Sequence, residues 1–95
     1  MATPEIPGAT GRVTRLYVTR TPSPARGVTF IRLDIPASEQ PKDGYFQLDQ
    51  SHPNYNALYS LALSAAINGY LLRIRTEGPI TPTEYAVVRY MVVNW

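Results

Sequence analysis

The sequence predicts a mainly β fold with one long helix, in the order three strands, one helix and two strands. All nine prolines and five of the six glycines fall between stretches that have a regular apolar pattern, so they mark turns and loops. The stretches on either side of residues 51–69 are rich in β-branched residues, as strands are. Residues 51–72 instead place apolar side chains at helical spacing and contain no charged residue.

The strands predicted before the helix cover residues 12–20, 28–35 and 45–49. Turn residues separate them, because residues 21–27 hold two prolines and a glycine, and residues 36–44 end in Asp-Gly. In the second strand alternate residues are apolar, and this period of two indicates a half-buried strand. We expect its core face to consist of Ile31, Leu33 and Ile35, with Val28, Phe30, Arg32 and Asp34 on the other face.

The helix is predicted to begin at Ser51 as the N-cap and to end at Gly69, which can adopt the left-handed conformation. At about 100° per residue, one side of this helix is apolar and the other carries small polar side chains. The apolar side consists of Leu58, Tyr59, Leu61, Ala62, Ala65 and Ala66, and the polar arc of Asn56, Ser60, Ser64 and Asn68, bordered by Leu63 and Ile67.

The last two strands are predicted at residues 70–76 and 84–94. The final strand is apolar on both faces when a strict alternation is assumed, with Met91 and Val93 opposite Ala86 and Val88, so we expect both faces to be covered. Its terminal residue Trp95 indicates docking against a neighbouring subunit or packing on the chain's own helix.

This order of elements is that of the OB-fold, a five-stranded Greek-key barrel. We therefore predict a β-β-β-α-β-β OB-fold barrel that forms a single domain over residues 1–95, with residues 1–10 as an extended or flexible N-terminal segment. A layered α+β sheet covered by one helix has the same order of elements and is the alternative.

Composition excludes several classes of protein. Charged residues make up 17% of the chain and the net charge is +2, which excludes a disordered polyelectrolyte and argues against a dedicated nucleic-acid polycation. No cysteine is present, so disulfides and thiolate metal sites are excluded. No apolar run reaches the roughly 20 residues that span a bilayer, so we expect no membrane insertion. We expect a secreted protein if a leader has been removed, and a cytoplasmic one otherwise.

The uncharged helix predicts self-association. Exposed helix faces normally carry charged residues, and a domain of 95 residues has few other elements with which to cover a helix on all sides. A helix buried in a monomer is the alternative to a homo-oligomer. The predicted oligomer interface consists of Asn56, Tyr59, Ser60, Leu63, Ser64, Ile67 and Trp95.

Residues for catalysis are scarce. The chain has no cysteine, so a Cys-His arrangement is excluded, and its only histidine, His52, lies in the first turn of the predicted helix, where we expect it to cap the helix or face solvent. His52 and Asp49 are residue types that can ligate a metal together, and there is no glycine-rich phosphate loop. We expect a binding protein without catalytic activity, metal or cofactor.

The two strands of the first hairpin and the end of the helix resemble the B subunits of AB5 toxins, particularly the subtilase-cytotoxin and pertussis-like branch. The matching stretches are GRVTRLYVTR, GVTFIRLDI and AAINGYLLRIRTE, and the resemblance covers about residues 11–93. It implies an OB-fold protomer, a ring of five with helices lining a pore, glycan binding on a barrel face and a catalytic A-type chain as partner. The chain departs from the family because it lacks cysteines and has PGAT before the first strand, where the family has an aromatic-serine segment that engages sialic acid. Thr10 is the only hydroxyl there, so sialoglycan specificity does not carry over.

Seven tyrosines and eight arginines suit carbohydrate, whose rings lie on aromatic faces, and also single-stranded nucleic acid, whose bases stack on them. Taken with the resemblance, they predict a homo-oligomeric glycan-binding subunit. A nucleic-acid-binding OB-fold and a purely structural ring are the alternatives. The candidate ligand-binding residues are Thr10, Tyr17, Arg32, Arg73 and Arg75.

Overall fold

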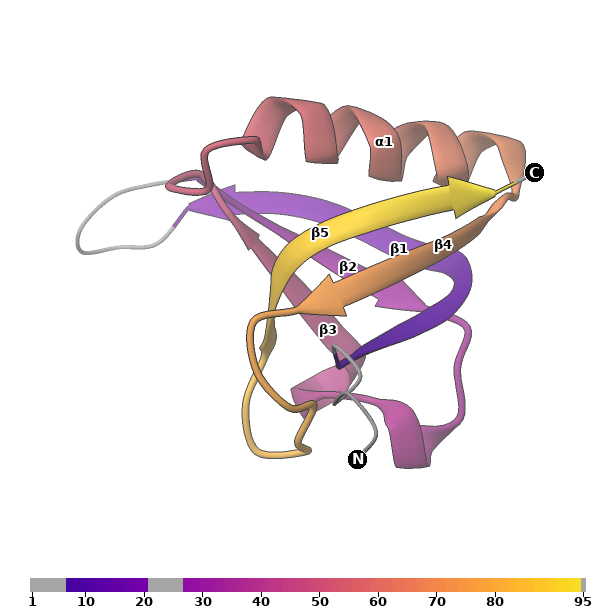
Figure 1. Ribbon diagram of the computed structural model, residues 1–95, viewed down its shortest axis with the longest axis vertical. Coiled ribbons are helices and arrows are strands. Elements are labelled where there is room, and N and C mark those ends of the chain that lie inside the picture. The colour runs from indigo at the N-terminus through magenta and orange to yellow at the C-terminus, as the bar shows by residue number, and fades with distance from the viewer. Residues whose placement is uncertain (1–6, 21–26, 95) are drawn as a thin grey trace, which may run out of the picture.

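The computed structural model describes residues 7–20 and 27–94. Its elements are β1 (Gly8–Arg20), β2 (Gly27–Leu33), the single-turn 3-10 helices η1 (Ala37–Glu39) and η2 (Lys42–Gly44), β3 (Tyr45–Asp49), α1 (Tyr55–Asn68), β4 (Leu71–Thr76) and β5 (Ala86–Asn94). The five strands form a sheet closed into a ring, in the order β1-β2-β3-β5-β4, and α1 lies across one end of it (Figure 1). The prediction of a mainly β fold with one long helix is confirmed.

The long, bent strand β1 pairs with two neighbouring strands. Its first residues pair with β4, from Gly8 opposite Arg75 to Arg12 opposite Leu71, and its remaining residues pair with β2. The prediction that the first strand starts at residue 12 is wrong, because β1 begins at Gly8. Glycine is a weak strand former, but here it permits close approach: a Cβ on Gly11 would lie 2.9 Å from the carbonyl oxygen of Asp34.

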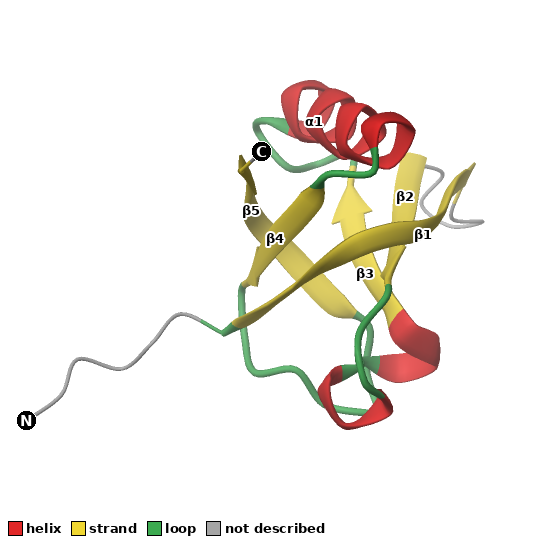
Figure 2. Cartoon of the chain, turned by 90° about the vertical axis from the view of Figure 1, so that its right-hand side faces the viewer, coloured by secondary structure: helices red, strands yellow, loops and turns green. Residues whose placement is uncertain are grey.

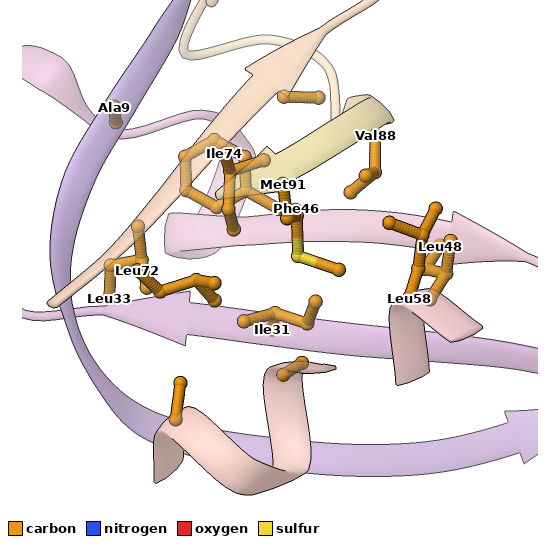
Figure 3. Packing of buried hydrophobic residues seen from close by; sticks show 13 residues of the cluster. Ala9, Ile31, Leu33, Phe46, Leu48, Leu58, Leu72, Ile74, Val88 and Met91 are labelled. Carbon is orange, nitrogen blue, oxygen red and sulfur yellow. The ribbon is translucent and has the colours of Figure 1, made fainter. Parts of the chain in front are cut away.

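Closure of the ring depends on a short parallel contact between β3 and β5. Phe46 lies opposite Ala86 and Gln47 opposite Val87, whereas every other strand pair is antiparallel. Apolar side chains fill the interior beside this contact (Figure 3). The innermost of them, all fully buried, are Ile31, Phe46, Leu48, Leu72 and Ile74.

One face of α1 closes the end of the ring with Leu58, Ala62 and Ala65, which are buried. Ala62 and Ala65 are fully inaccessible, and their small side chains let the helix backbone lie close to the strands. The helix therefore covers the core with one face, as the spacing of its apolar residues predicts.

The predicted core face of β2 is confirmed for Ile31 and Leu33, and Ile35 is half-buried just beyond the strand. One neighbour differs from expectation, because Val28, expected on the outer face, is buried. Thr29 is also buried, and its hydroxyl lies 2.8 Å from the hydroxyl of Tyr55 on α1. This hydrogen bond satisfies a buried polar group where α1 crosses β2.

A bulge in β5 changes which of its residues face the core. Thr76 pairs with Val88 and Arg75 pairs with Tyr90, so Arg89 is the extra residue. The bulge puts Val88 and Met91 on the same, inner side. The predicted strict alternation, which separated Met91 and Val93 from Ala86 and Val88, is therefore wrong.

The start of α1 also differs from the prediction. The helix begins at Tyr55 rather than after an N-cap at Ser51, and Asn54 at the cap position makes no side-chain cap bond. A turn replaces the expected first helical turn because two side chains satisfy its backbone: Asp49 Oδ1 accepts from the Ser51 N–H at 2.9 Å, and His52 Nδ1 accepts from the Asn54 N–H at 3.0 Å.

The end of α1 at Gly69 is confirmed, since Gly69 has φ 69° and its N–H donates to the carbonyl of Ala65. Replacing Gly69 with alanine is expected to lower the free energy of unfolding by about 1 kcal/mol, because a side chain disfavours the left-handed conformation. Gly78→Ala is the matched control: a Cβ meets nothing within 4 Å at either position, but only Gly69 has a positive φ. Urea denaturation of both variants measures the difference, and equal losses would contradict the conformational explanation.

Candidate functional site

Four aromatic rings gather on the outer side of β1, β2 and β3, and we call them the aromatic face: Tyr17, Phe30, Tyr45 and Tyr85. Tyr17 on β1 is the cross-strand partner of Phe30 on β2, and their ring centroids are 5.1 Å apart in a stacked arrangement. Tyr45 on β3 lies edge-on to both, with centroids 5.5 Å from Tyr17 and 5.8 Å from Phe30. Tyr85, just before β5, lies 5.2 Å from Phe30. Strand pairing and one loop thus bring together rings from distant parts of the chain.

Two cations border the aromatic face. Arg15 Nη1 donates to the Tyr45 hydroxyl at 2.9 Å, and this hydrogen bond raises the pKa of the Arg15 guanidinium, which stays charged. Lys42 Nζ lies 5.0 Å from the ring centroid of Tyr85, within cation–π distance. Tyr17 is 40% exposed, yet partial desolvation by its neighbours raises the pKa of its phenol, so it is a neutral hydrogen-bonding group at physiological pH.

A shallow polar cleft of about 350 Å³ adjoins the aromatic face at Arg15. It is lined by Thr14, Arg15, Arg32, Leu33, Asp34, Ile35 and Gln40. The loop before β3 shapes one side of it, because Asp43 (φ 56°) and Gly44 (φ 79°) are both left-handed and a Cβ on Gly44 would lie 3.1 Å from Arg32 Nε. Cations, a carboxylate and an amide therefore lie beside a set of aromatic rings, an arrangement that suits a ligand with both apolar and hydroxyl-bearing surfaces.

The five predicted ligand-binding residues fall into two groups. Tyr17 belongs to the aromatic face and Arg32 to the cleft beside it. Thr10 is instead the cross-strand partner of Arg73, and Arg75 pairs with Gly8, so these three residues share the outer side of β1 and β4. They do not belong to the aromatic face.

Sequence reasoning missed five residues of this region: Arg15, Phe30, Lys42, Tyr45 and Tyr85. The alternation of residues 28–35 already placed Phe30 and Arg32 on one face of their strand. The alternation of residues 45–49 likewise placed Tyr45 on the face of its strand that does not carry Phe46. Lys42 lies outside the predicted strands, so no periodicity signalled it. Tyr85 fell within the last predicted strand, residues 84–94, but β5 begins at Ala86 and leaves Tyr85 in the preceding loop.

Among the residues predicted to form an oligomer interface, Asn56, Ser60, Leu63, Ser64 and Ile67 are exposed on the outer face of α1. Tyr59 is half-buried and packs against the core, with its ring 6.5 Å from that of Tyr55. Trp95 lies outside the described residues. Ile67 is 75% exposed, so the alternative of a helix buried on all sides within one chain is wrong.

His52 lies in the turn before α1 with both ring nitrogens engaged. Because Nδ1 accepts from the Asn54 N–H, Nε2 carries the proton and donates to the carbonyl of Arg89 at 2.9 Å. Its ring thus ties the turn before α1 to the bulge of β5. Within residues 7–20 and 27–94, no group of three or more histidine or acidic side chains is arranged to hold a metal ion. No helix in the same residues is long and apolar enough to span a bilayer.

Comparisons of the chain with protein-family models, with curated proteins and with solved structures gave no match. The function is therefore inferred from the residues of the chain itself.

Proposed function

We propose that this protein is an OB-fold, glycan-binding subunit that recognises carbohydrate through the aromatic face. The strand order β1-β2-β3-β5-β4, the helix between β3 and β4, and a first strand that pairs on both sides support the OB-fold assignment. In OB-folds the outer face of the second and third strands commonly binds oligosaccharides or oligonucleotides. The aromatic face lies on the outer side of β2 and β3 and includes Phe30 and Tyr45 from these strands.

The gathering of four rings beside a polar cleft is the observation that supports carbohydrate. The apolar C–H faces of sugar rings pack on aromatic rings, while their hydroxyls need oriented donors and acceptors. Arg15 and Arg32 supply donors, Asp34 supplies an acceptor, and Gln40 lines the same cleft. Because Asp34 and Asp43 partly offset Arg15, Arg32 and Lys42, the region favours a neutral or weakly charged glycan over a polyanion.

We further propose that the outer face of α1 joins copies of the chain into a ring, with five copies as the AB5-like resemblance implies. The exposed Leu63 and Ile67 on a helix without charged residues support this association. A ring presents several aromatic faces at once, and multivalent contact raises the avidity for a glycan-coated surface without any new contact. A catalytic A-type chain is the partner that the same resemblance implies.

A glycan array followed by calorimetry tests the carbohydrate proposal. Tyr17→Ala is expected to weaken the binding of the best glycan about tenfold, because one aromatic contact contributes roughly 1 kcal/mol or slightly more. Tyr90→Ala is the matched control, since Tyr90 is equally exposed (38% against 40%) but lies on β5, outside the aromatic face. Equal losses in the two variants would place the glycan elsewhere.

Salt dependence separates carbohydrate from the alternatives. Binding of a neutral glycan is expected to change little between about 50 and 200 mM salt, whereas binding of a single-stranded oligonucleotide falls steeply over this range. Nucleic acid would replace carbohydrate as the proposed ligand if no glycan on the array bound, an oligonucleotide bound tightly, and Tyr17→Ala abolished that oligonucleotide binding. A protein that binds neither would be a structural ring.

A further inference from the structure

A second surface, on the other side of β1, holds arginines that the aromatic face does not use. Figure 2 shows β4 and the first part of β1 side by side, with α1 beyond one end of them. We call the outward-pointing residues of this surface the arginine face: Thr10, Arg12, Leu71, Arg73, Arg75, Tyr90 and Val92. The register places Arg73 at its centre, between Thr10 on β1 and Val92 on β5.

The strand residues of this surface carry charge of one sign. Strands β1, β4 and β5 contain no aspartate or glutamate, and three of their six arginines, Arg12, Arg73 and Arg75, belong to the arginine face. The acidic residues Glu77 and Glu84 lie in the loop between β4 and β5, at the end of the ring opposite α1 (Figure 1), and Glu39 lines a cleft with Gly8, the cross-strand partner of Arg75. Arg73 and Arg75 are two positions apart on one strand, so their Cα atoms are about 7 Å apart.

Arg12 extends the positive surface toward the helix. Its Nε donates to the carbonyl of Gly69 at 3.1 Å, which holds the guanidinium against the end of α1. The two terminal nitrogens of the group carry its remaining donors, which suit the oxygens of a phosphate. Arg12 and Arg73 are both exposed.

The arginine face is also partly apolar. Leu71 is 43% exposed and is the cross-strand partner of Arg12, and Val92 is half-buried beside Arg73. Three clefts on the described residues are lined by residues outside this face. An extended anionic surface would meet several arginines of the face at once.

We propose that the arginine face binds the surface of a lipid bilayer that contains anionic phospholipids. Arginine binds phosphate oxygens with two parallel hydrogen bonds, and a basic residue near an anionic leaflet contributes about 1 kcal/mol. Leu71 and Val92 add apolar contact at the level of the headgroups, which a nucleic acid or a sulfated polysaccharide would use poorly. Single-stranded nucleic acid would also need several stacked aromatic rings, whereas this face holds one exposed ring, that of Tyr90, the cross-strand partner of Arg75.

Co-sedimentation of the full chain with vesicles tests this proposal. We expect binding to phosphatidylcholine vesicles that contain about 30% phosphatidylserine, no binding to phosphatidylcholine alone, and weakening as salt rises from about 50 to 200 mM. Arg73→Gln is expected to weaken the partition about fivefold, and Arg12→Gln with Arg73→Gln about 25-fold. Arg20→Gln is the matched control, because Arg20 is an exposed arginine at the far end of β1 and pairs with β2.

Several outcomes would overturn the proposal. Equal weakening by Arg20→Gln and Arg73→Gln would mean that net charge alone drives the association. Equal binding to both vesicle types would exclude recognition of anionic lipid. Binding to heparin or to an oligonucleotide in the absence of vesicle binding would assign the face to a different polyanion. Because all three arginines are exposed, circular dichroism of each variant is expected to match the parent chain, which separates binding from folding.

Discussion

Phe46→Ala is expected to lower the free energy of unfolding by about 3–5 kcal/mol. Phe46 is fully buried and is opposite Ile31 on one side and Ala86 on the other, so its ring fills the interior where β3 and β5 close the ring of strands. Removing it leaves a cavity that the flanking strands cannot fill without breaking their pairing. Small domains are stable by about 5–15 kcal/mol in total, so urea denaturation should show a large fall in the midpoint.

Phe30→Ala provides a control of the same chemical type. Phe30 lies on β2, which pairs with β3, but its ring points outward into the aromatic face and is only partly buried. We expect a loss of roughly 1–2 kcal/mol, since no interior cavity forms. A loss as large as that of Phe46→Ala would mean that the outer rings stabilise the fold as strongly as the core does.

The positions of the strands and the end of α1 were predictable because each depends on local pattern. Ile31 and Leu33 lie on either side of Arg32, which is the alternation of a half-buried strand. Gly69 directly follows Asn68, the last helical residue. The bulge at Arg89 was not predictable, because it depends on how Arg75 and Thr76 pair with β5. A single extra residue reverses every later side chain in a strand, so pattern alone misassigned the faces of β5.

The candidate site was less accessible to prediction than the fold. Tyr17 was found because it lies in a clear strand, but its grouping with Tyr85 depends on ring closure and on a loop. The sequence also grouped Thr10 and Arg73 with Tyr17, although β1 is bent and presents its two parts to different neighbours. Residue type selected the candidate side chains, whereas the topology separated them into two surfaces.

The uncharged face of α1 gives the prediction with the largest effect on assembly. If α1 joins copies of the chain, light scattering on a sizing column should give five times the mass of one chain, independent of protein concentration. Ile67→Glu is expected to give monomers, because each copy would bury a carboxylate against an apolar neighbour without a partner charge. Ile67 is the most exposed large apolar side chain in the described residues, so the substitution should leave the fold of a single chain intact.

Val87→Glu is the matched control for this change. Val87 is an apolar β-branched residue that is also exposed (43%), but it lies at the start of β5, at the end of the ring away from α1 (Figure 1). If only Ile67→Glu dissociates the assembly, α1 forms the interface. If both do, charge disfavours association wherever it is added, and α1 has no special role. A parent chain that is monomeric at every concentration would contradict the ring itself and leave the aromatic face as the binding surface of a single subunit.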